Sequence, residues 1–490
     1  MKNIFKYVLT LLIIGAFSTS CNEDFLEVQP TEFLSQEQIA EAAANNPDVI
    51  AGSVAGIYTL LFEAGTGGTT SHDDFGQKGY DIYSDMLCGD MALSVSTYGW
   101  YRRLTEFQPT QDYTSTTNYK VWRYYYRIIR SANSVIDALG GNDVVPELDE
   151  NKHLMGQAKA LRAYGYFYLA QFFQDGYNPS QVILPIYTNP NQENQPKSAA
   201  SEVYALIVKD LNDAISLLET FSRASKNQVN QSVAKGLLAY TYGAMGDYAQ
   251  VKTLTQDILN SGFTLMNSDE VTGGFNNVSI AGWMWGQDIT LDNGLDLVSW
   301  WGQMDVFTYS YQWAGDRKAI DQDLYDAIGD DDVRKSQFHP TAGGYYLIPL
   351  NKFYDNGREI GGQRNVTTDY LYMRVAEMYL LNAEAAANTG DEATAKISLK
   401  FLLDQRMADT SFIDGLSGKA LLDEIYLQTR IELWGEGKSY LAMKRNKATV
   451  TRGDNHLSNV GVAISYDDTR LSFLIPQSEI QNNPFINEQN

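Results

Sequence analysis

Two segments far apart in the chain repeat one pattern: a helix with small residues, a Gly-Asp turn and a second helix. Residues 237–249 read LLAYTYGAMGDYA, and residues 380–393 read LLNAEAAANTGDEA. When the Gly-Asp pairs are aligned, a leucine, two alanines, the glycine and the aspartate coincide, so that Gly246 matches Gly390. Small residues let paired helices approach closely, and glycine readily ends a helix in the left-handed conformation. The repeat therefore predicts helix pairs that stack side by side.

Helical periodicity also marks the segment before this repeat. Apolar side chains recur at helical spacing from Trp122 to Leu139 and again from Tyr204 to Leu218. Between them, residues 152–174 include the run MGQAKALRAYGYFYLAQFF, which is rich in alanine and aromatic residues. Helix pairs of this kind are typical of tetratricopeptide arrays, in which each pair buries its apolar face against its neighbours. We therefore predict a mainly α fold built on a tetratricopeptide-like helical superhelix.

Residues 262–370 have a different composition, rich in Gly, Asn, Asp, Tyr and Trp, with few sustained helical stripes. They separate the two copies of the repeat, and we interpret them as an inserted loop-rich subdomain that binds ligand. The predicted organisation is a signal segment at 1–20, an N-terminal segment at 21–116 with one helix and part of the ligand face, and tetratricopeptide-like helices at 117–261. More such helices and a tail come after the insert, at 371–490.

The first residues have the layout of an export signal. Lys2 and Lys6 precede an apolar run at 7–17, and small residues then lead to Cys21. The run is about 16 Å long as a helix, against about 30 Å for a bilayer core, so it is too short for a permanent transmembrane helix. A cysteine directly after the cut predicts a bacterial lipoprotein, acylated on Cys21 after removal of 1–20. The alternative is an ordinary secreted protein with a chance cysteine.

The net charge and the number of cysteines exclude some classes of ligand and an internal disulfide. The formal net charge is −23, and removing residues 1–20 would remove two lysines and no acids. No polybasic patch offsets this excess, so we predict that the chain binds neither nucleic acid nor anionic lipid directly. With Cys21 acylated, only Cys88 would remain, so no internal disulfide could form.

Five segments together resemble the SusD/RagB family of Bacteroidetes nutrient-capture lipoproteins. One is similar to the family's lipidated start, two to its first helical pair, one to its central R-x-AE helix and one to its tail. In chain order they read CNEDFLEVQPTEF, VWRYYYRIIRSANSVIDAL, GQAKALRAYGYFYLAQFF, YLYMRVAEMYLLNAEAAANTGD and FLIPQSEIQNNPFINEQN. Their order and spacing, more than any single piece, carry the resemblance.

The resemblance implies a right-handed superhelix of about four tetratricopeptide units cradling a loop-rich ligand face. It also implies a lipid-anchored protein at the cell surface of the outer membrane, seated as a hinged lid on a SusC-like TonB-dependent transporter. Glu23 and Asp24 after Cys21 are similar to the acidic tag that directs such lipoproteins to the surface. One motif departs from the family pattern, since EGKSYLAMKRN places Ser439 and Ala442 where Arg and Asp are usual. The ligand class is therefore not inherited from the resemblance.

No catalytic or metal-binding signature is present. The histidines His72, His153, His339 and His456 are far apart, and the chain has no GxSxG, GxxxxGK[ST] or HExxH motif. The acidic run at 330–332 and a similar run at 292–296 could bind calcium, although such runs more often form helix starts or solvated turns. We predict no catalytic residue, no metal and no cofactor.

Aromatic residues instead mark the predicted ligand face, on the loops of residues 70–102 and the insert at 283–313. Aromatic rings stack on the C–H faces of sugars, while polar side chains bond the hydroxyls. For any single ring, core packing in a helix-poor subdomain is the stronger alternative, whereas for the group we expect some rings to line the ligand face. The predicted stacking residues are Trp100, Trp300, Trp301 and Trp313, with Tyr98 as an amphipathic helper, and the predicted hydroxyl partners are Asp73, Asp74 and Arg102.

The leading functional hypothesis is capture of a glycan and its delivery to the transporter. Capture of peptides by the same scaffold is the second hypothesis. A surface glycosidase is a third, disfavoured because no catalytic signature is found, and a protein-interaction scaffold is the general alternative for tetratricopeptide arrays.

Overall fold

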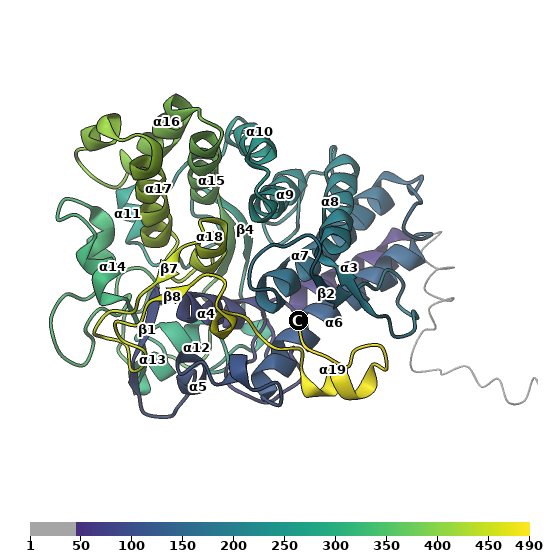
Figure 1. Cartoon of the computed structure of the whole chain (residues 1–490), viewed down its shortest axis with the longest axis horizontal. Coiled ribbons are helices and arrows are strands. Elements are labelled where there is room, and N and C mark those ends of the chain that lie inside the picture. Colours follow the sequence, from purple (N-terminus) through teal and green to yellow (C-terminus); the bar gives the residue numbers. More distant parts are fainter. Residues whose placement is uncertain (1–45) are drawn as a thin grey trace, which may run out of the picture.

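The structure, a computed structural model, describes residues 46–490 and is mainly helical (Figure 1). The signal expected at 1–20 and the lipidation expected at Cys21 lie outside the described residues. Between residues 46 and 490, no helix combines the length and apolarity that a membrane span requires. The N-terminal elements are α3 (Pro47–Thr59), α4 (Gln77–Leu87), β1 (Met91–Ser96), α5 (Arg102–Thr105) and η2 (Pro109–Gln111).

A row of long helices comes next. Its elements are α6 (Thr116–Ala138), α7 (Asp149–Phe173), β2 (Val182–Pro185), β3 (Lys197–Ala199), α8 (Ala200–Leu217), α9 (Gln231–Met245) and α10 (Tyr248–Leu259). Each helix packs against the next one in sequence, from α6 on α7 to α9 on α10. Glycine permits the closest approach, since a Cβ at Gly165 of α7 would lie 2.8 Å from Ile129 of α6.

The insert and the C-terminal part complete the chain. The insert holds α11 (Ser268–Val271), β4 (Trp283–Gln287), η3 (Leu291–Asn293), α12 (Trp301–Met304), α13 (Tyr311–Ala314), β5 (Asp316–Ile320), α14 (Gln322–Asp326) and η4 (Val333–Gln337), and β6 (Tyr370–Arg374) leads out of it. The last elements are α15 (Val375–Asn388), α16 (Glu392–Leu403), η5 (Ser411–Gly415), α17 (Gly418–Glu432), α18 (Ser439–Arg445), β7 (Thr449–Val450), β8 (Ile464–Ser465), η6 (Thr469–Leu471) and α19 (Gln477–Asn482).

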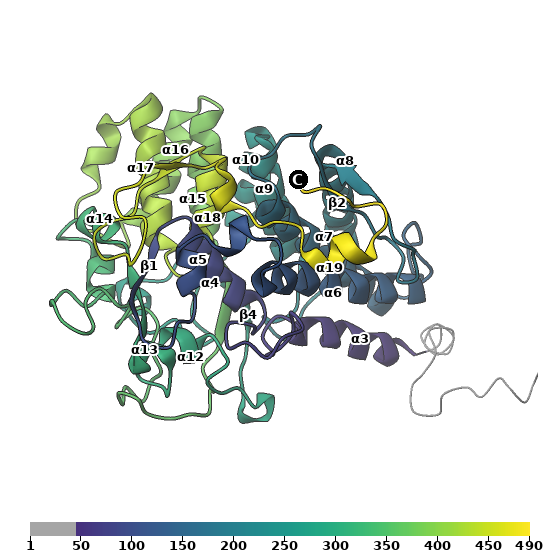
Figure 2. The same ribbon diagram turned by 60° about the horizontal axis from the view of Figure 1, so that its bottom comes forward.

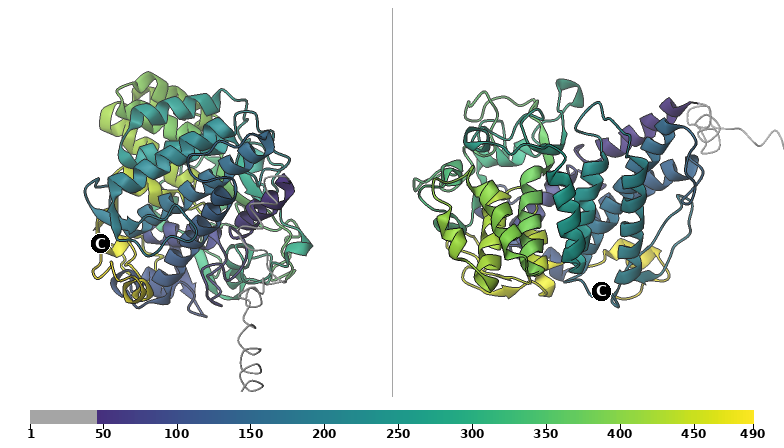
Figure 3. Two further views of the ribbon diagram at one scale, coloured as in Figure 1. Left: turned by 90° about the vertical axis from the view of Figure 1, so that its right-hand side faces the viewer. Right: turned by 90° about the horizontal axis from the view of Figure 1, so that it is seen from above.

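The row of helices continues across the insert, because α10 packs on α15, and α15 packs on α16 and α17. Seen from above, the long helices stand side by side, with the loops of the insert gathered along one edge (Figure 3). From α6 to α10 and from α15 to α17, eight helices form this row. The predicted fold class, a mainly α superhelix with an inserted loop-rich part, is confirmed.

Both Gly-Asp turns adopt the predicted geometry. Gly246 and Gly390 have φ values of +80° and +79°, in the left-handed region that favours glycine. The carboxylate of Asp247 then caps α10 by accepting from the N–H of Gln250 at 3.3 Å. Asp391 caps α16 in the same way. The repeat seen in the sequence is therefore a repeat of structure, and it makes α9–α10 and α15–α16 equivalent helix pairs.

The described strands form four two-stranded antiparallel sheets, β1–β5, β2–β3, β4–β6 and β7–β8. Two of them hold the insert in place. In the first, β5 pairs with β1 of the N-terminal segment, and Met91 lies opposite Ile320. In the second, β4 pairs with β6, which runs directly into α15. The loop-rich insert is thus fixed at both ends by backbone hydrogen bonds.

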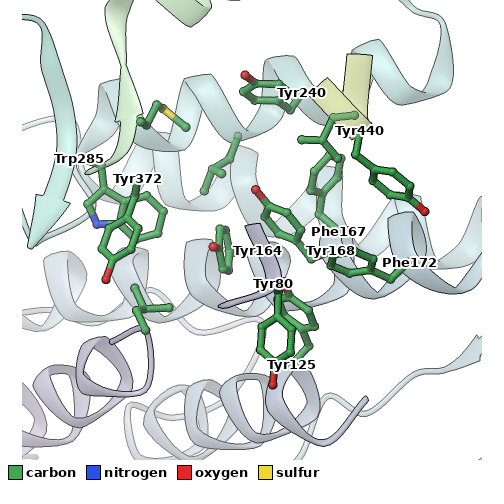
Figure 4. Packing of buried hydrophobic residues seen from close by; sticks show 14 of the residues in the cluster. Tyr80, Tyr125, Tyr164, Phe167, Tyr168, Phe172, Tyr240, Trp285, Tyr372 and Tyr440 are labelled. Carbon is green, nitrogen blue, oxygen red and sulfur yellow. The ribbon is translucent and has the colours of Figure 1, made fainter. Parts of the chain in front are cut away.

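Aromatic side chains fill the centre of the core (Figure 4). Tyr125 of α6 and Tyr168 of α7 stack with ring centroids 5.5 Å apart and an interplanar angle of 1°. Trp285 of β4 meets Tyr164 edge-on at 5.4 Å and packs on Tyr372 of β6 at 5.1 Å. The sheet β4–β6 therefore rests on the long helices through rings, which supply large contact area with few rotatable bonds.

A buried charge network joins the insert to the C-terminal helices. The guanidinium of Arg374, at the end of β6, bonds Glu432 at 2.6 Å and Glu436 at 2.7 Å. Glu432 also pairs with Arg334 of the insert at 3.1 Å and with Arg406 at 2.9 Å. Burial alone would raise the pKa of Glu432, yet the three guanidinium groups hold it well below its usual value. Glu432 thus stays ionised in the core.

Candidate functional site

The pairing of β1 with β5 brings two aromatic segments together. Ser96, the last residue of β1, lies opposite Asp316, the first residue of β5. The pairing extends by one step, since the N–H of Thr97 donates to the carbonyl of Gly315 at 3.1 Å. In an antiparallel pair, the residues just after one strand lie beside the residues just before the other. The loop at 98–100 therefore meets helix α13, although more than two hundred residues separate them.

The carboxylate of Asp316 fixes the backbone of this loop. It accepts from the N–H of Tyr98 at 2.8 Å, of Gly99 at 3.4 Å and of Trp100 at 3.0 Å. Asp316 is fully buried. A buried carboxylate that satisfies three backbone donors gives the loop one preferred conformation. The rings of Tyr98 and Trp100 are thus presented by a rigid backbone.

Rings from three segments meet where this loop reaches α13. The rings of His72 and Trp100 stack with centroids 5.1 Å apart and an interplanar angle of 3°. Tyr311 stands edge-on to Trp100 at 5.8 Å and to Tyr98 at 5.6 Å. Its hydroxyl lies 2.6 Å from Nδ1 of His72. These contacts fix the positions of the rings, while Tyr98 remains 61% exposed to solvent.

The same short segment carries a second pair of rings, Tyr309 and Trp313, with centroids 5.6 Å apart. They are 39% and 36% exposed. Gly361 lies against the Trp313 ring, where a Cβ would stand 2.6 Å from it. The guanidinium of Arg364 lies over the Tyr309 ring at 5.3 Å. We call His72, Tyr98, Trp100, Tyr309, Tyr311 and Trp313 the aromatic platform.

A buried lysine supports the platform from beneath. Nζ of Lys318 donates to Oε1 of Gln303 at 2.8 Å and to the carbonyl of Asp316 at 2.9 Å. The amide of Gln303 donates in turn to the carbonyl of His72 at 2.8 Å. Burial, opposed in part by the carboxylates of Asp316 and Asp73, lowers the pKa of Lys318 to about 7. The platform thus rests on a polar network whose charge depends on pH.

Two predicted hydroxyl partners serve the protein's own structure instead. Asp73 is buried and accepts from Nζ of Lys120 and from the hydroxyl of Tyr83, both at 2.5 Å. Asp74 is fully buried and accepts from the N–H of Gly67 at 2.7 Å and of Thr69 at 3.0 Å. Because their oxygens are occupied internally, the site that we propose excludes both. These residues shape the loop that carries His72.

Two of the four predicted stacking residues are core residues. Trp300 and Trp301 are 2% and 0% exposed, so neither presents a ring face to solvent. Trp300 packs edge-on against Phe353 at 5.3 Å, with Nζ of Lys78 lying 4.2 Å from its ring centroid. Core packing, the alternative role of aromatic residues in a helix-poor segment, applies to this pair. The proposed site excludes them as well.

The other four predicted residues lie at or beside the platform. Tyr98, Trp100 and Trp313 belong to it, and Arg102 begins α5 directly after the loop. The side chain of Arg102 is 62% exposed and pairs with Glu106 at 3.0 Å. No group of three or more His, Cys, Asp or Glu side chains within residues 46–490 could hold a metal ion.

Comparison with known sequences identifies the family. Residues 24–242 match the family described as "Starch-binding associating with outer membrane", and residues 303–490 match the "SusD family". The chain belongs to the SusD family. SusD-like protein P2 of Formosa agariphila is 24% identical over 90% of this chain and 91% of its own length. SusD-like protein P25 of the same organism is 25% identical over 39% of this chain, and the match spans about a third of that relative.

Solved structures of the SusD family share the fold. A SusD-like carbohydrate binding protein from Bacteroides vulgatus is 26% identical with a TM-score of 0.75, covering 90% of this chain and 97% of that one. A SusD superfamily protein from Bacteroides thetaiotaomicron is 24% identical with a TM-score of 0.76, covering 91% and 99%. Surface glycan-binding protein A from Bacteroides uniformis, 18% identical, has a TM-score of 0.68, with 91% and 99% covered.

Three platform residues were absent from the sequence-based site: His72, Tyr309 and Tyr311. Both tyrosines lie in the aromatic-rich part of the insert, so composition carried a signal for them. His72 gave no such signal, because its role depends on stacking against Trp100 across the fold. The register of β1 against β5 brings the segments of Trp100 and Tyr311 together, and that register is not visible in either strand's sequence alone.

Proposed function

We propose that this SusD family protein captures oligosaccharide on the aromatic platform and delivers it to a SusC-like TonB-dependent transporter in the outer membrane. The observation that carries the proposal is the fixed, solvent-facing arrangement of rings at Tyr98, Trp100 and Trp313. Asp316 and Lys318 hold this arrangement from below, so little conformational entropy would be lost when a ligand binds.

The chemistry of the platform suits a sugar. Aromatic faces bind the C–H surfaces of a pyranose, and the polar edges of tyrosine and tryptophan accept or donate hydrogen bonds at the rim. Arg102 and Arg364 are exposed beside the rings and can bond hydroxyls. A carbohydrate binding protein and a surface glycan-binding protein share this fold, which agrees with the proposal.

The platform offers no pair of carboxylates for glycoside hydrolysis, which needs an acid and a base or nucleophile across the scissile bond. The nearby acids Asp73 and Asp316 are buried and bonded to the protein's own donors. This supports a binding protein that releases its ligand unchanged. Proteins of the SusD family are binding proteins.

Binding is tested by calorimetric titration with a panel of neutral oligosaccharides and, separately, with peptides. We expect at least one oligosaccharide to bind the wild type and to bind Trp100→Ala or Trp313→Ala more weakly. The ligands are recovered afterwards and analysed for cleavage, with none expected. Binding of peptides alone would favour the peptide-capture hypothesis, and product formation that disappears on changing a single carboxylate would contradict a binding role.

Delivery and anchoring are tested in cells. We propose that Cys21 carries the lipid, which keeps the protein over the transporter and raises the effective ligand concentration at its mouth. Labelling with an alkyne fatty acid should tag the wild type, whereas Cys21→Ala should be untagged and released from the membrane. Solubilised wild-type membranes should yield the protein together with a large transporter. Recovery of free monomer alone, under conditions that preserve other such pairs, would count against delivery.

A further inference from the structure

A hollow lies away from the aromatic platform, along the outer side of α6. It has a volume of about 960 Å³ and is bounded by α6, the loop at 187–194 and helix α19. Figure 2 shows α19 beside α6, at a distance from the labels α12 and α13 that mark the platform's part of the insert. We call this hollow the α6 groove. No residue of the platform lines it.

Three arginines line the α6 groove from one face of the helix. Arg123, Arg127 and Arg130 are spaced by four and three residues, and all three are exposed. Within residues 46–490, none of the three forms an ion pair, and Arg127 makes one long bond, to the carbonyl of Thr66 at 3.5 Å. Among residues 46–490, Glu479 is the single carboxylate in the lining. This is a positive site on a chain of net charge −23.

Glu479 carries one negative charge against three positive ones, and it forms no ion pair with any of the three arginines, because its oxygens accept from other donors. One accepts from Nε1 of Trp122 at 3.2 Å, and the other accepts from Nδ2 of Asn483 at 2.9 Å. Many arginines elsewhere in the chain have acidic partners, as Arg162 has in Asp210 at 2.7 Å. Three arginines without an ion-pair partner among residues 46–490, on one helix face, raise the local potential and favour an anionic ligand.

The wall of the groove is aromatic and rigid. The rings of Trp122 and Tyr126 lie 4.8 Å apart, and Tyr187 stands edge-on to Tyr126 at 5.8 Å. The hydroxyl of Tyr126 donates to the carbonyl of Pro185 at 2.9 Å, which fixes the ring. The lining also contains side-chain amides, including those of Asn189 and Asn194. Rings, amides and guanidinium groups together match the apolar face, hydroxyls and acidic groups of a charged sugar.

We propose that the α6 groove is a second glycan subsite, selective for sugars that carry carboxylate or sulfate groups. This inference rests on glycan capture as the proposed function and adds a charge preference to it. Guanidinium groups bind planar or tetrahedral oxyanions through paired hydrogen bonds. Arg123 and Arg130 are about 10 Å apart along the helix axis, a span comparable with one disaccharide repeat. An acidic glycan can therefore place successive charges against successive arginines.

The loop at 65–74 connects the α6 groove to the platform. At one end, the side chain of Arg123 lies against Gly68, where a Cβ would stand 2.2 Å from its Nε. At the other end, His72 stacks on Trp100 of the platform. The carboxylate of Asp74 fixes the loop conformation by accepting from the backbone N–H groups of Gly67 and Thr69. One extended glycan can thus use both places, with its charged residues at α6 and an uncharged face on the rings.

The test is titration of the full mature chain with three polyanionic sugars: a chondroitin sulfate oligosaccharide, a polygalacturonate oligosaccharide and a heparin oligosaccharide. Polygalacturonate carries carboxylates alone, whereas the other two sugars carry carboxylates and sulfates, so binding of those two and not of polygalacturonate would show that sulfate is required. The key variant is Arg123→Gln/Arg127→Gln/Arg130→Gln. The matched control, Lys209→Gln/Lys396→Gln/Lys419→Gln, removes the same charge from helices outside the groove. Thermal unfolding of both variants shows whether they are folded.

We expect at least one polyanion to bind at low salt, and the triple arginine variant to bind it roughly tenfold more weakly or worse, while the lysine control binds as the wild type does. Higher salt should weaken binding, because the screening length falls from about 10 Å at 0.1 M to about 3 Å at 1 M. The arginine variant should retain binding of any neutral oligosaccharide held by the platform.

Three results would overturn the inference. One is that no polyanion binds, or that the arginine and lysine variants lose binding equally. Another is that Trp100→Ala abolishes polyanion binding while the arginine variant does not. The third is that the arginine variant binds sugars normally but no longer co-purifies with the transporter, which would make the groove a protein interface. In each case, titration of the wild type with neutral oligosaccharides tests the proposed glycan capture separately from the α6 groove.

Discussion

The carboxylate of Asp316 accepts a hydrogen bond from the backbone N–H of Trp100 at 3.0 Å, across 216 residues of sequence. The same carboxylate bonds the N–H of Tyr98 and of Gly99. Its position at the start of β5 is set by the antiparallel pairing with β1. One buried side chain of the insert therefore fixes the backbone of the loop that carries Tyr98 and Trp100.

Asp316→Ala should release this loop. Three backbone donors would lose their acceptor, at a cost of about 1–3 kcal/mol in the free energy of unfolding. The amides of residues 98–100 should exchange with solvent hydrogen at least about tenfold faster. Hydrogen exchange followed by mass spectrometry measures the effect. Asp247→Ala, which removes an exposed helix cap far from the platform, is the control and should leave exchange at 98–100 unchanged.

The half-buried Trp100 and the fully buried Trp301 should respond differently when each is changed to alanine. Trp100→Ala should weaken oligosaccharide binding by about 1–3 kcal/mol, roughly five- to hundredfold, with a small change in stability. Trp301→Ala should instead lower the free energy of unfolding by about 3–5 kcal/mol, because Trp301 is 0% exposed. Calorimetric titration and thermal unfolding of each variant separate the two effects. If Trp100→Ala lost stability and binding in step, its ring would be structural.

The helical part of this fold was predictable because its signals are local. The Gly-Asp turns at Gly246 and Gly390 each combine a left-handed residue with a helix cap, and both can be recognised within a few residues. The fold class can be inferred from such repeats. The loop-rich composition of the insert was equally visible, although its internal arrangement was not.

The platform was only partly predictable because burial depends on distant contacts. Trp300 and Trp313 have similar sequence surroundings, rich in aromatic and polar residues. One packs on Phe353 and the other stays 36% exposed. The residues near each ring in the sequence do not indicate which distant side chain, if any, will cover it. Asp73 presents the same difficulty, since its partner Lys120 belongs to α6.

The stability of the protein should rise with pH above neutrality through Lys318. Burial lowers the pKa of this amine to about 7, from 10.5 when it is exposed. Below about pH 7 the lysine is protonated in both folded and unfolded chains. Between these pKa values the unfolded chain binds a proton that the folded chain has released, so raising the pH favours the folded state.

Lys318→Met removes this titration, so its stability should depend less on pH between about 7 and 10. The slope should fall by up to about 1.4 kcal/mol per pH unit relative to the wild type. Denaturant unfolding at several pH values measures the slopes, and Lys419→Met, at an exposed position, is the control. Lys444, whose pKa burial lowers to about 7, should preserve part of the slope in both variants. If the free energy of unfolding changed with pH by the same amount in wild type and in Lys318→Met, the lysine would not be desolvated.

Glu432→Gln should be among the most destabilising single substitutions in the C-terminal helices. Glu432 is paired with three buried guanidinium groups, those of Arg334, Arg374 and Arg406. Replacing the carboxylate by an amide removes the only charge that all three share and leaves the positive charges facing one another out of water. Breaking a buried pair in this way costs about 3–5 kcal/mol in the free energy of unfolding.

Arg334 belongs to the insert and Arg374 ends β6. Loss of the Glu432 carboxylate should therefore also loosen the insert. Denaturant unfolding of Glu432→Gln should show the lower stability, and limited proteolysis should cut within residues 321–370 sooner than in the wild type. Asp423→Asn on the same helix α17 is the matched control, since its carboxylate is 61% exposed and pairs only with Lys419. It should change the free energy of unfolding by less than about 1 kcal/mol. Equal effects of the two substitutions would mean that the buried network contributes no more than a surface ion pair.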